Sequence, residues 1–240
     1  MQSLAGRPLL GHLFNSVEKL NPEKIHVVVG PEIDSVRQSF PSQNINWVTQ
    51  AERLGTGHAV MQALPHLGKD VRLLILLGDA PLISTNTMQE LISSDAPLTV
   101  LTSNVDDPQG YGRIIRDHGG SISAIVEERD ATQQQILIKE INTGVMAINS
   151  RSLSEWLPKL SRTNAQGELL LTDIVAIANE QAIEVNACAT EDKLEVRGVN
   201  TFVQLGDLER SLQQRYARDL QEAGVHLVDP QRFDQRGELI

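Results

Sequence analysis

The sequence predicts an α/β fold in which a mostly parallel sheet is covered by helices on both faces. Short, continuously apolar stretches such as 25–29 and 73–77 alternate with segments of helical periodicity over roughly the first hundred residues, a pattern typical of sheets buried on both faces. The 240 residues suffice for one large domain with a buried core. Apolar residues make up 40% of the chain, too large a share for a disordered protein.

The expected elements of this parallel part follow in chain order. A helical repeat that includes Leu9, Leu13 and Leu20 begins near the first residue with no strand before it, and Asn21-Pro22 ends that helix. We expect strands at 25–29, 45–49, 73–77 and 98–102, and helices at 33–40, 58–67 and 87–93.

The pattern changes after Asp106. Residues 113–116 and 122–126, joined through His118-Gly119-Gly120, predict an antiparallel hairpin. A strand at 141–148, helices at 153–160 and 169–178, an extended segment at 183–188 and a long amphipathic helix ending at Gly224 complete the expected elements. The polar stretch 229–240 predicts a linker.

Charge and residue usage exclude several classes of protein. The formal net charge of −10 argues against a nucleic-acid-binding protein, which needs a basic face, but not against a nucleotide-binding enzyme. The longest apolar run, 73–77, is too short to span a membrane. The lone Cys188 cannot form an internal disulfide, which fits a cytoplasmic protein. The six histidines show no metal-binding spacing.

A candidate base-binding loop lies between an expected strand and an expected helix. Gln50 offers a donor and an acceptor that could recognise a planar base, and Gly55 and Gly57 flank Thr56, so that backbone amides can approach a ligand. Alternatively, Thr56 caps the following helix. The spacing alone leaves both interpretations open, since the lysine of a P-loop is absent.

A candidate metal ligand, Asp79, follows Leu77 and Gly78 after the most apolar strand. Open α/β sheets bind ligands at this end of their strands, and a carboxylate suits Mg²⁺. Alternatively, Asp79 is a turn aspartate that bonds its own backbone.

Four further residues have both a functional and a structural interpretation. Gly112 could give an amide to a substrate or serve a turn. Glu127 and Asn142 could hold sugar hydroxyls, although the run that Glu127 begins is also typical of a solvated surface. Asn200 could coordinate a metal or cap the long C-terminal helix.

Taken together, these segments resemble one bacterial family. Trp47-Val48-Thr49-Gln50-Ala51-Glu52-Arg53-Leu54-Gly55-Thr56-Gly57-His58-Ala59 is the longest of them, and the others are 4–9, 78–82, 107–114, 125–127, 140–144, 164–168, 172–174 and 198–200. In this order they look like the N-terminal uridylyltransferase domain of the bifunctional N-acetylglucosamine-1-phosphate uridylyltransferase/glucosamine-1-phosphate acetyltransferase family (GlmU). The likeness covers nearly the whole chain.

The resemblance implies a Rossmann-like nucleotidyltransferase fold and a Mg²⁺-dependent reaction of UTP with N-acetylglucosamine 1-phosphate. The products are UDP-N-acetylglucosamine, which feeds peptidoglycan and lipopolysaccharide synthesis, and pyrophosphate. Carried over by motif, Gln50, Gly55 and Thr56 hold uracil, Leu77 and Gly78 line the nucleotide, and Gly112, Glu127 and Asn142 hold the sugar. Asp79 and Asn200 hold the metal.

Two features of the family are not matched in the chain. The family has a first strand followed by a loop of the type L-A-A-G-x-G-T-R-M and then a lysine, and the catalytic Arg and Lys lie in that missing N-terminal part. It also has a β-helix acetyltransferase domain. We therefore expect a piece of such an enzyme with impaired activity, with a nucleotidyltransferase domain at 1–228 and the start of a linker at 229–240. The family is homotrimeric, and we expect a monomer here.

Two alternatives stay open at this point. One is a non-catalytic nucleotide-sugar-binding remnant, and the other is a pyrophosphorylase of another nucleotide sugar. A glycosyltransferase is disfavoured because no D-x-D motif follows the strand before Asp79.

Overall fold

The structure, a computed structural model, describes residues 2–41 and 45–237, which divide into two compact units. Unit 1 comprises Met1–Asn21, Leu77–Thr85 and Asp192–Ile240, and unit 2 comprises Pro22–Leu76 and Asn86–Glu191. Both units are discontinuous in sequence, and each has its own core.

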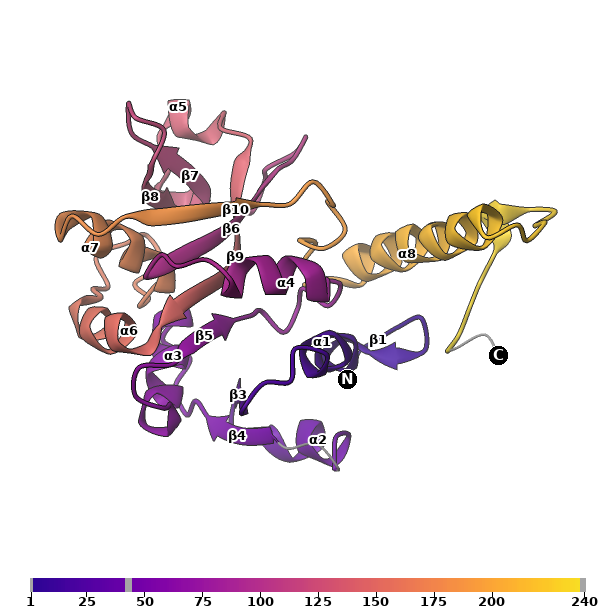
Figure 1. The fold of residues 1–240 in the computed structure, drawn as a ribbon, viewed down its shortest axis with the longest axis horizontal. Helices are drawn as coiled ribbons and strands as arrows, with labels where there is room; N and C mark the ends of the chain where they lie inside the picture. The colour runs from indigo at the N-terminus through magenta and orange to yellow at the C-terminus, as the bar shows by residue number, and fades with distance from the viewer. Residues whose placement is uncertain (1, 42–44, 238–240) are drawn as a thin grey trace. The chain divides into compact units, whose positions relative to one another are not determined.

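Unit 2 is built around a six-stranded sheet in the order β10-β6-β9-β7-β8, with β5 paired to β9 (Figure 1). Its strands are β5 (Arg72–Ile75), β6 (Leu98–Asn104), β7 (Arg113–Arg116), β8 (Ile122–Val126), β9 (Glu140–Asn149) and β10 (Val185–Ala189). All six strands fall on or beside predicted ones, and the bounds of β7 and β8 are those predicted.

The sheet is mixed, so the prediction of a mostly parallel sheet is wrong. Only β10 pairs in parallel with β6, whereas β9 pairs antiparallel with β5, β6 and β7. The physical reason is pairing: the short helix α5 (Gln133–Ile136) connects β8 to β9 across β7, and β9 then runs opposite to both β7 and β6, a direction that its own composition does not determine. The register shifts opposite residues 100–102 of β6, where Gly144 has φ +78°, so β9 bends as it leaves β5 for β7.

Two strands of unit 2 form a parallel sheet of their own. They are β3 (Ile25–Val29) and β4 (Ile45–Thr49), connected by α2 (Ile33–Gln38). Both strands have the predicted bounds, because each is a short segment rich in apolar residues.

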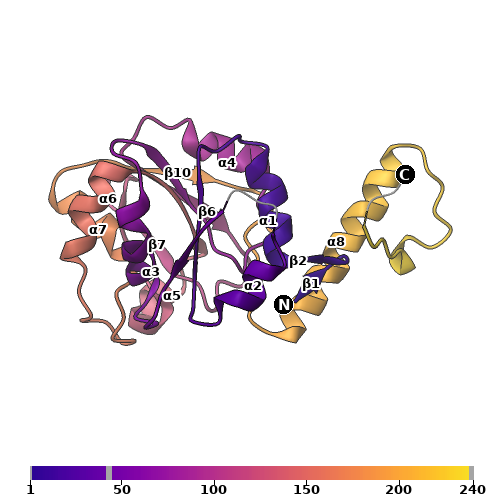
Figure 2. The same cartoon turned by 90° about the horizontal axis from the view of Figure 1, so that it is seen from below.

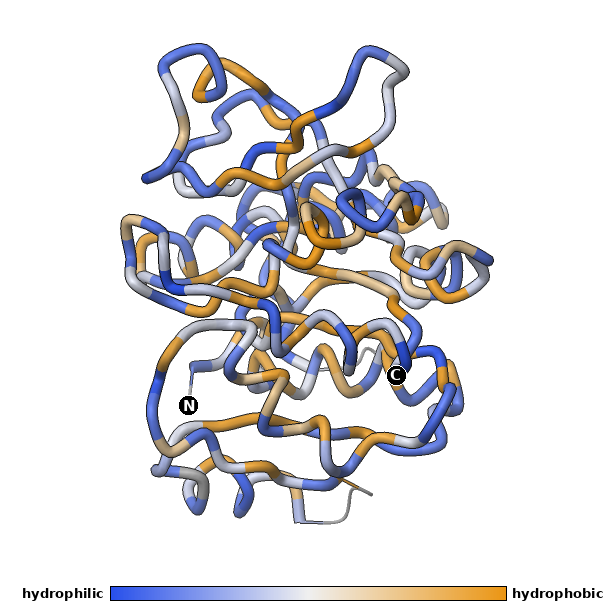
Figure 3. Tube along the Cα trace, turned by 90° about the vertical axis from the view of Figure 1, so that its left-hand side faces the viewer, coloured by the Kyte–Doolittle hydropathy of each residue, from blue (hydrophilic) through white to orange (hydrophobic). Residues whose placement is uncertain are grey.

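Helices cover both faces of the main sheet, as predicted. Leu98 and Val100 pack in one core with residues of α6 (Ser150–Trp156) and α7 (Ile174–Glu180) and with Val60 of α3 (Thr56–Ala63). Side chains alternate along a strand, so Thr99 faces the other side, where it bonds Ser94 just after α4 (Thr85–Ile92). Figure 2 shows α3, α6 and α7 gathered on one side and α4 apart from them. Figure 3 shows hydrophobic and hydrophilic stretches alternating along the chain trace.

Unit 1 joins a hairpin and a helix near the N-terminus to the long C-terminal helix. The hairpin strands β1 (Ser3–Leu4) and β2 (Arg7–Pro8) precede α1 (Leu9–Glu18), and α8 spans Phe202–Glu222. Their shared core comprises Leu4, Ala5, Leu9, Val199, Leu208 and Leu212. No strand was expected before α1. The signal for this hairpin is weak because Ala5, at φ +47°, and Gly6, at φ +79°, form the turn in place of the usual Asn-Gly.

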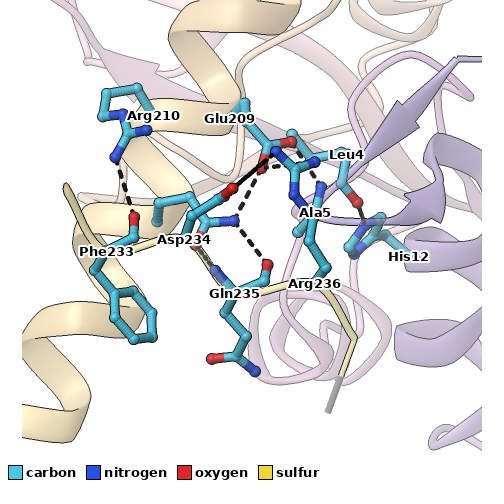
Figure 4. A network of polar contacts seen from close by, with 10 residues as sticks. Leu4, Ala5, His12, Glu209, Arg210, Phe233, Asp234, Gln235 and Arg236 are labelled. Atoms are coloured by element: carbon cyan, nitrogen blue, oxygen red, sulfur yellow. Dashed lines mark hydrogen bonds and ion pairs between the residues drawn. The ribbon is translucent and has the colours of Figure 1, made fainter. Parts of the chain in front are cut away.

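The polar segment after α8 is held in place over residues 229–237, where it includes the turn η5 (Pro230–Arg232). The buried Gln213 side chain accepts from Gln235 N (2.7 Å) and donates to Gln235 O (2.9 Å). Figure 4 shows Phe233 to Arg236 of this segment beside α8 and the hairpin. In addition, Gly237 N donates to Ala5 O (3.3 Å). A domain boundary after residue 228 stays a prediction, and residues 238–240 lie outside the described part.

Within the part of the chain that the structure describes, no helix is both long enough and apolar enough to cross a membrane.

Candidate functional site

Three predicted sugar ligands meet at the ends of adjacent strands of unit 2. Arg113 of β7 is opposite Val126 of β8 and Ile141 of β9. Gly112, just before Arg113, therefore lies between Glu127 on one side and Asn142 on the other. Gly112 O accepts from Asn142 N (2.8 Å), and a side chain at Gly112 would begin 3.4 Å from Glu127 Oε2. A glycine at this position therefore leaves the carboxylate open to a ligand.

The Glu127 carboxylate is partly buried and is oriented by a neighbouring hydroxyl. Thr172 Oγ1 donates to Glu127 Oε1 (3.1 Å), which leaves Oε2 on the side of Gly112. Burial raises the pKa of Glu127, the Thr172 hydrogen bond lowers it, and the charges of Asp173 and Asp130 raise it. Glu127 is thus partly withdrawn from solvent, whereas Arg129 and Asp130 of the same charge run are exposed.

The predicted base loop follows β4. Gln50 Nε2 donates to Gly55 O (3.2 Å) and lies 3.0 Å from His58 Nδ1. His58 is in turn contacted by Gln62 (3.1 Å). The amide nitrogen of Gln50 is used within the loop, and its oxygen is the atom available to a base. His58, which the sequence presents as an ordinary histidine, therefore fixes the orientation of Gln50.

Gly55 is the N-cap of α3, so the alternative in which Thr56 caps this helix is wrong. Gly55 has φ +111° and ψ 174°, a region almost restricted to glycine. The Thr56 hydroxyl accepts instead from Leu171 N (3.0 Å), and Gly57 N donates to Leu169 O (2.8 Å). The loop and the start of α3 are thereby attached to residues 169–171.

The turn η4 (Leu171–Asp173) connects the base loop with the sugar ligands. Leu171 N bonds Thr56, and the next residue, Thr172, bonds Glu127. Thr172 is buried and received no functional role from the sequence. Only its place in the resembling segment 172–174 pointed to it, because nothing in the local pattern reveals a contact with a residue 45 positions away.

The predicted metal ligands lie together in unit 1. Val199 N donates to Asp79 O (2.9 Å). A side chain at Gly198 would begin 3.6 Å from Asp79 Oδ2 and 3.9 Å from Asn200 Nδ2, so both side chains border the same glycine. Leu77 and Gly78 lead into this site, with Ala80 N bonded to Leu77 O (3.3 Å).

Asp79 and Asn200, the predicted metal ligands, differ in the hydrogen bonds that they make within the chain. Burial raises the pKa of Asp79, and a hydrogen bond from its own backbone N–H lowers it, as the turn-aspartate interpretation expects. Its role as a metal ligand stays a prediction. Asn200 does not cap α8. Thr201 does, through a capping box with Gln204, so the Asn200 side chain is not committed to the helix end.

The donor set fits a hard cation with few protein ligands. The described residues contain no cluster of three or more His, Cys, Asp or Glu side chains suited to a metal. One carboxylate and one amide oxygen, from Asp79 and Asn200, nevertheless suit Mg²⁺, which proteins commonly hold through one or two carboxylates together with substrate phosphates.

Comparison with known families agrees with this arrangement. Residues 1–167 match the sequence profile of the MobA-like NTP transferase domain. The chain belongs to this family. The confirmed α/β architecture of this NTP transferase domain also agrees with that of a solved UDP-glucose pyrophosphorylase complexed with UDP-glucose. The TM-score is 0.70 at 14% identity, over 90% of each chain, a likeness that concerns the fold alone.

Curated relatives align with the whole NTP transferase chain. Three proteins named "Bifunctional protein GlmU" match 100% of it: those of Saccharophagus degradans (46% identical), Pseudomonas aeruginosa (48%) and Acinetobacter baumannii (49%). The chain spans 53%, about half, of the length of each.

Proposed function

We propose that this chain is a uridylyltransferase domain. Its reaction joins UTP to N-acetylglucosamine 1-phosphate, giving UDP-N-acetylglucosamine and pyrophosphate. The observation that carries the proposal is the group formed by Gly112, Glu127 and Asn142, tied through Leu171 and Thr172 to the loop of Gln50, Gly55 and Thr56. A sugar site and a base site joined by one short turn are what a nucleotide-sugar enzyme requires. The 46–49% identity to GlmU proteins supports the choice of sugar and base.

The sugar is recognised by groups of opposite hydrogen-bonding character. The Glu127 carboxylate accepts from sugar hydroxyls, and the Gly112 amide and the Asn142 side-chain nitrogen donate. Asn142 Oδ1 already accepts from Gly144 N (3.1 Å), which orients the Asn142 amide with its nitrogen away from that bond. A hexose with free hydroxyls and an acetamido carbonyl matches this set.

Asp79 and Asn200 are the residues that would hold Mg²⁺. The ion supplies neutralisation of phosphate charge and a template for the triphosphate. The half-buried Asp79 carboxylate gains from such a partner, because a nearby cation offsets the partial burial that raises its pKa.

Transfer then depends on positioning. An oxygen of the sugar phosphate forms a bond to the α-phosphorus of UTP, and the bond from that phosphorus to the bridging oxygen breaks, with the electron pair leaving on pyrophosphate. A phosphate monoester has a second pKa of about 6, so the attacking oxygen needs no general base. The base loop and the sugar ligands hold the two reactants in line. The resemblance assigns leaving-group stabilisation to an Arg and a Lys of a Gly-rich loop that these 240 residues do not match.

The remaining parts of the proposal concern context. We place the transferase domain at 1–228, the start of a linker at 229–240, the location in the cytoplasm and the role in peptidoglycan and lipopolysaccharide precursor synthesis. We also propose that this chain is a monomer.

Calorimetry and a pyrophosphate-release assay together test the proposal. We expect the chain to bind UDP-N-acetylglucosamine more tightly than UDP-glucose, and to turn over UTP with N-acetylglucosamine 1-phosphate slowly if at all. Tighter binding of UDP-glucose would favour a pyrophosphorylase of another sugar. Binding with no turnover, even after the Gly-rich loop is supplied in a longer chain, would favour a non-catalytic remnant.

A further inference from the structure

Arg113, at the start of β7, is a fully buried arginine beside the sugar ligands. Its side chain is 1% exposed. Its guanidinium donates to Tyr111 O, to Glu128 Oε2 (3.0 Å) and, through Nε, to Ile136 O (3.4 Å). Three segments therefore meet at this one side chain: the turn before β7, the residues after β8, and α5.

Burial of this charge requires a structural explanation. A guanidinium loses several kcal/mol of hydration on burial, so such pairs are weak evidence for stability as such. Arg116, on the same strand, is 36% exposed and pairs with Glu140 (2.6 Å). The contrast indicates that β7 does not need a buried ion pair to form.

The Arg113–Glu128 pair closes a ring of contacts around the turn that presents Gly112. Glu128 Oε2 accepts from Gly110 N (2.6 Å) as well as from Arg113. These two bonds, that of Gly110 first, lower the pKa of Glu128 and keep it anionic. Arg113 in turn bonds Tyr111 O. Both residues before Gly112 are thus held by the pair, and Gly110, at φ +84°, lies in a turn conformation.

We propose that the Arg113–Glu128 ion pair positions the sugar site, by fixing the Gly112 amide relative to the Glu127 carboxylate. Gly112 directly precedes Arg113, and Glu127 directly precedes Glu128. We therefore expect loss of the pair to change the separation of these two sugar ligands. This inference rests on the proposed function, which assigns the sugar to these residues.

If the ion pair positions the sugar site, its loss should weaken binding of the sugar and leave binding of the nucleotide unchanged. The Gln50 loop binds the base through other elements, so the affinity for UDP is independent of the turn at 110–112. The gain in affinity that the sugar adds, measured as the ratio of the Kd for UDP to the Kd for UDP-N-acetylglucosamine, depends on the separation of Gly112 and Glu127.

The test compares this ratio in the wild-type chain, Glu128→Gln and Arg113→Lys by calorimetry. We expect both substitutions to lower the affinity for UDP-N-acetylglucosamine about tenfold, or about 1.4 kcal/mol, with the UDP affinity unchanged within about twofold. Glu128 is 32% exposed, and glutamine keeps an acceptor for Gly110 N, so this variant decides the question even if Arg113→Lys does not fold.

Arg116→Gln is the matched control, since it removes the ion pair at the other end of the same strand. We expect it to leave both affinities unchanged. An unaltered ratio in Glu128→Gln, or an equal fall in Arg116→Gln, would overturn the inference while the proposed function stands. A wild-type chain that gains no affinity from the sugar would refute the sugar assignment of the proposed function, and this inference with it.

Discussion

At the scale of single residues, Glu127 combines a functional role with a cost in stability. Burial raises the pKa of this carboxyl, so the folded state favours its protonated form. A raised folded pKa gives a contribution to stability that is complete below the unfolded pKa and is lost as the pH rises through the folded pKa. At neutral and higher pH the ionised Glu127 therefore destabilises the chain.

Glu127→Gln should separate these two roles. We expect a higher melting temperature than that of the wild-type chain at pH 8, and a difference that shrinks towards pH 4, where both side chains are neutral. The affinity for UDP-N-acetylglucosamine should fall about tenfold or more, because hydrogen bonds to charged groups contribute roughly 1.5–3 kcal/mol. Thermal unfolding at several pH values and calorimetry measure the two effects. A lower melting temperature at pH 8 would contradict the pKa direction.

The hydrogen bond from Thr172 lowers the pKa of Glu127, so removing the Thr172 hydroxyl should change that pKa. Thr172→Val keeps the side-chain volume and deletes the hydrogen bond to Glu127 Oε1, so the pKa of Glu127 should rise further. Thr172→Ser keeps the hydroxyl and should behave like the wild type. Carbon-13 NMR of the Glu127 carboxyl during a pH titration reports the change. Equal titration of the valine and serine variants would rule out this contact in solution.

Asp79 should govern the effect of magnesium on nucleotide binding. The Asp79→Asn chain should bind UTP no more tightly with Mg²⁺ than without it, because the carboxylate is the only charged member of the Asp79–Asn200 pair. Without Mg²⁺ its affinity for UTP should equal or exceed that of the wild type, since a negative charge near the phosphates is removed. Calorimetry with and without Mg²⁺ makes the comparison. A Mg²⁺-dependent gain that survives the substitution would place the metal elsewhere.

At the scale of elements, the start of α3 depends on one glycine. A side chain at Gly55 would begin 2.5 Å from Leu169 O, at φ +111°. Gly55→Ala should lower the free energy of unfolding by about 2–5 kcal/mol, from backbone strain and overpacking combined. Gly206, inside α8, has nothing within 4 Å of its Cβ position, so Gly206→Ala should stabilise the chain by about 0.5–1 kcal/mol. Urea denaturation compares the two, and similar effects would contradict the structure.

The elements also mark how far the sequence alone can predict this fold. β3, β4, β7 and β8 have the predicted bounds, because their apolar runs end at turn residues. The antiparallel direction of β9 could not be predicted, since a strand's direction depends on pairing rather than on its own composition. The alternative roles of Thr56 and Asn200 as helix caps were wrong for a similar reason. Both residue types are favoured at N-caps, but Gly55 is the N-cap of α3 and Thr201 is the N-cap of α8.

The sequence predicts the candidate ligands of the site, but not the residues that hold these ligands in place. Gly112 directly precedes a predicted strand, Glu127 directly follows one, and Asn142 lies at the start of a third, so the strand ends already indicated them. Thr172, His58 and the Arg113–Glu128 pair act through contacts between distant segments. Such contacts leave no trace in local periodicity or spacing, and only the folded chain reveals them.

At the scale of the whole molecule, unit 1 draws on both halves of the sequence. Its core joins Leu4 and Leu9 to Val199, Leu208 and Leu212. Glu209 of α8 accepts from Ala5 N (2.7 Å), and the segment 229–237 adds bonds to Gln213 and to Ala5. The segment that composition identifies as a linker is therefore part of the stability of unit 1.

A double-mutant cycle tests this contribution, using the full chain and a chain ending at residue 228, each with and without the substitution Gln213→Leu. In the full chain, leucine removes both bonds to the Gln235 backbone and should destabilise. In the shortened chain, Gln213 has already lost these partners and keeps its bond to Glu209 Oε1 (2.9 Å), so leucine should cost less than it does in the full chain. We expect a coupling energy of about 1–3 kcal/mol from urea denaturation. Additive effects would mean that residues 229–237 do not engage Gln213 in solution and act as a free linker.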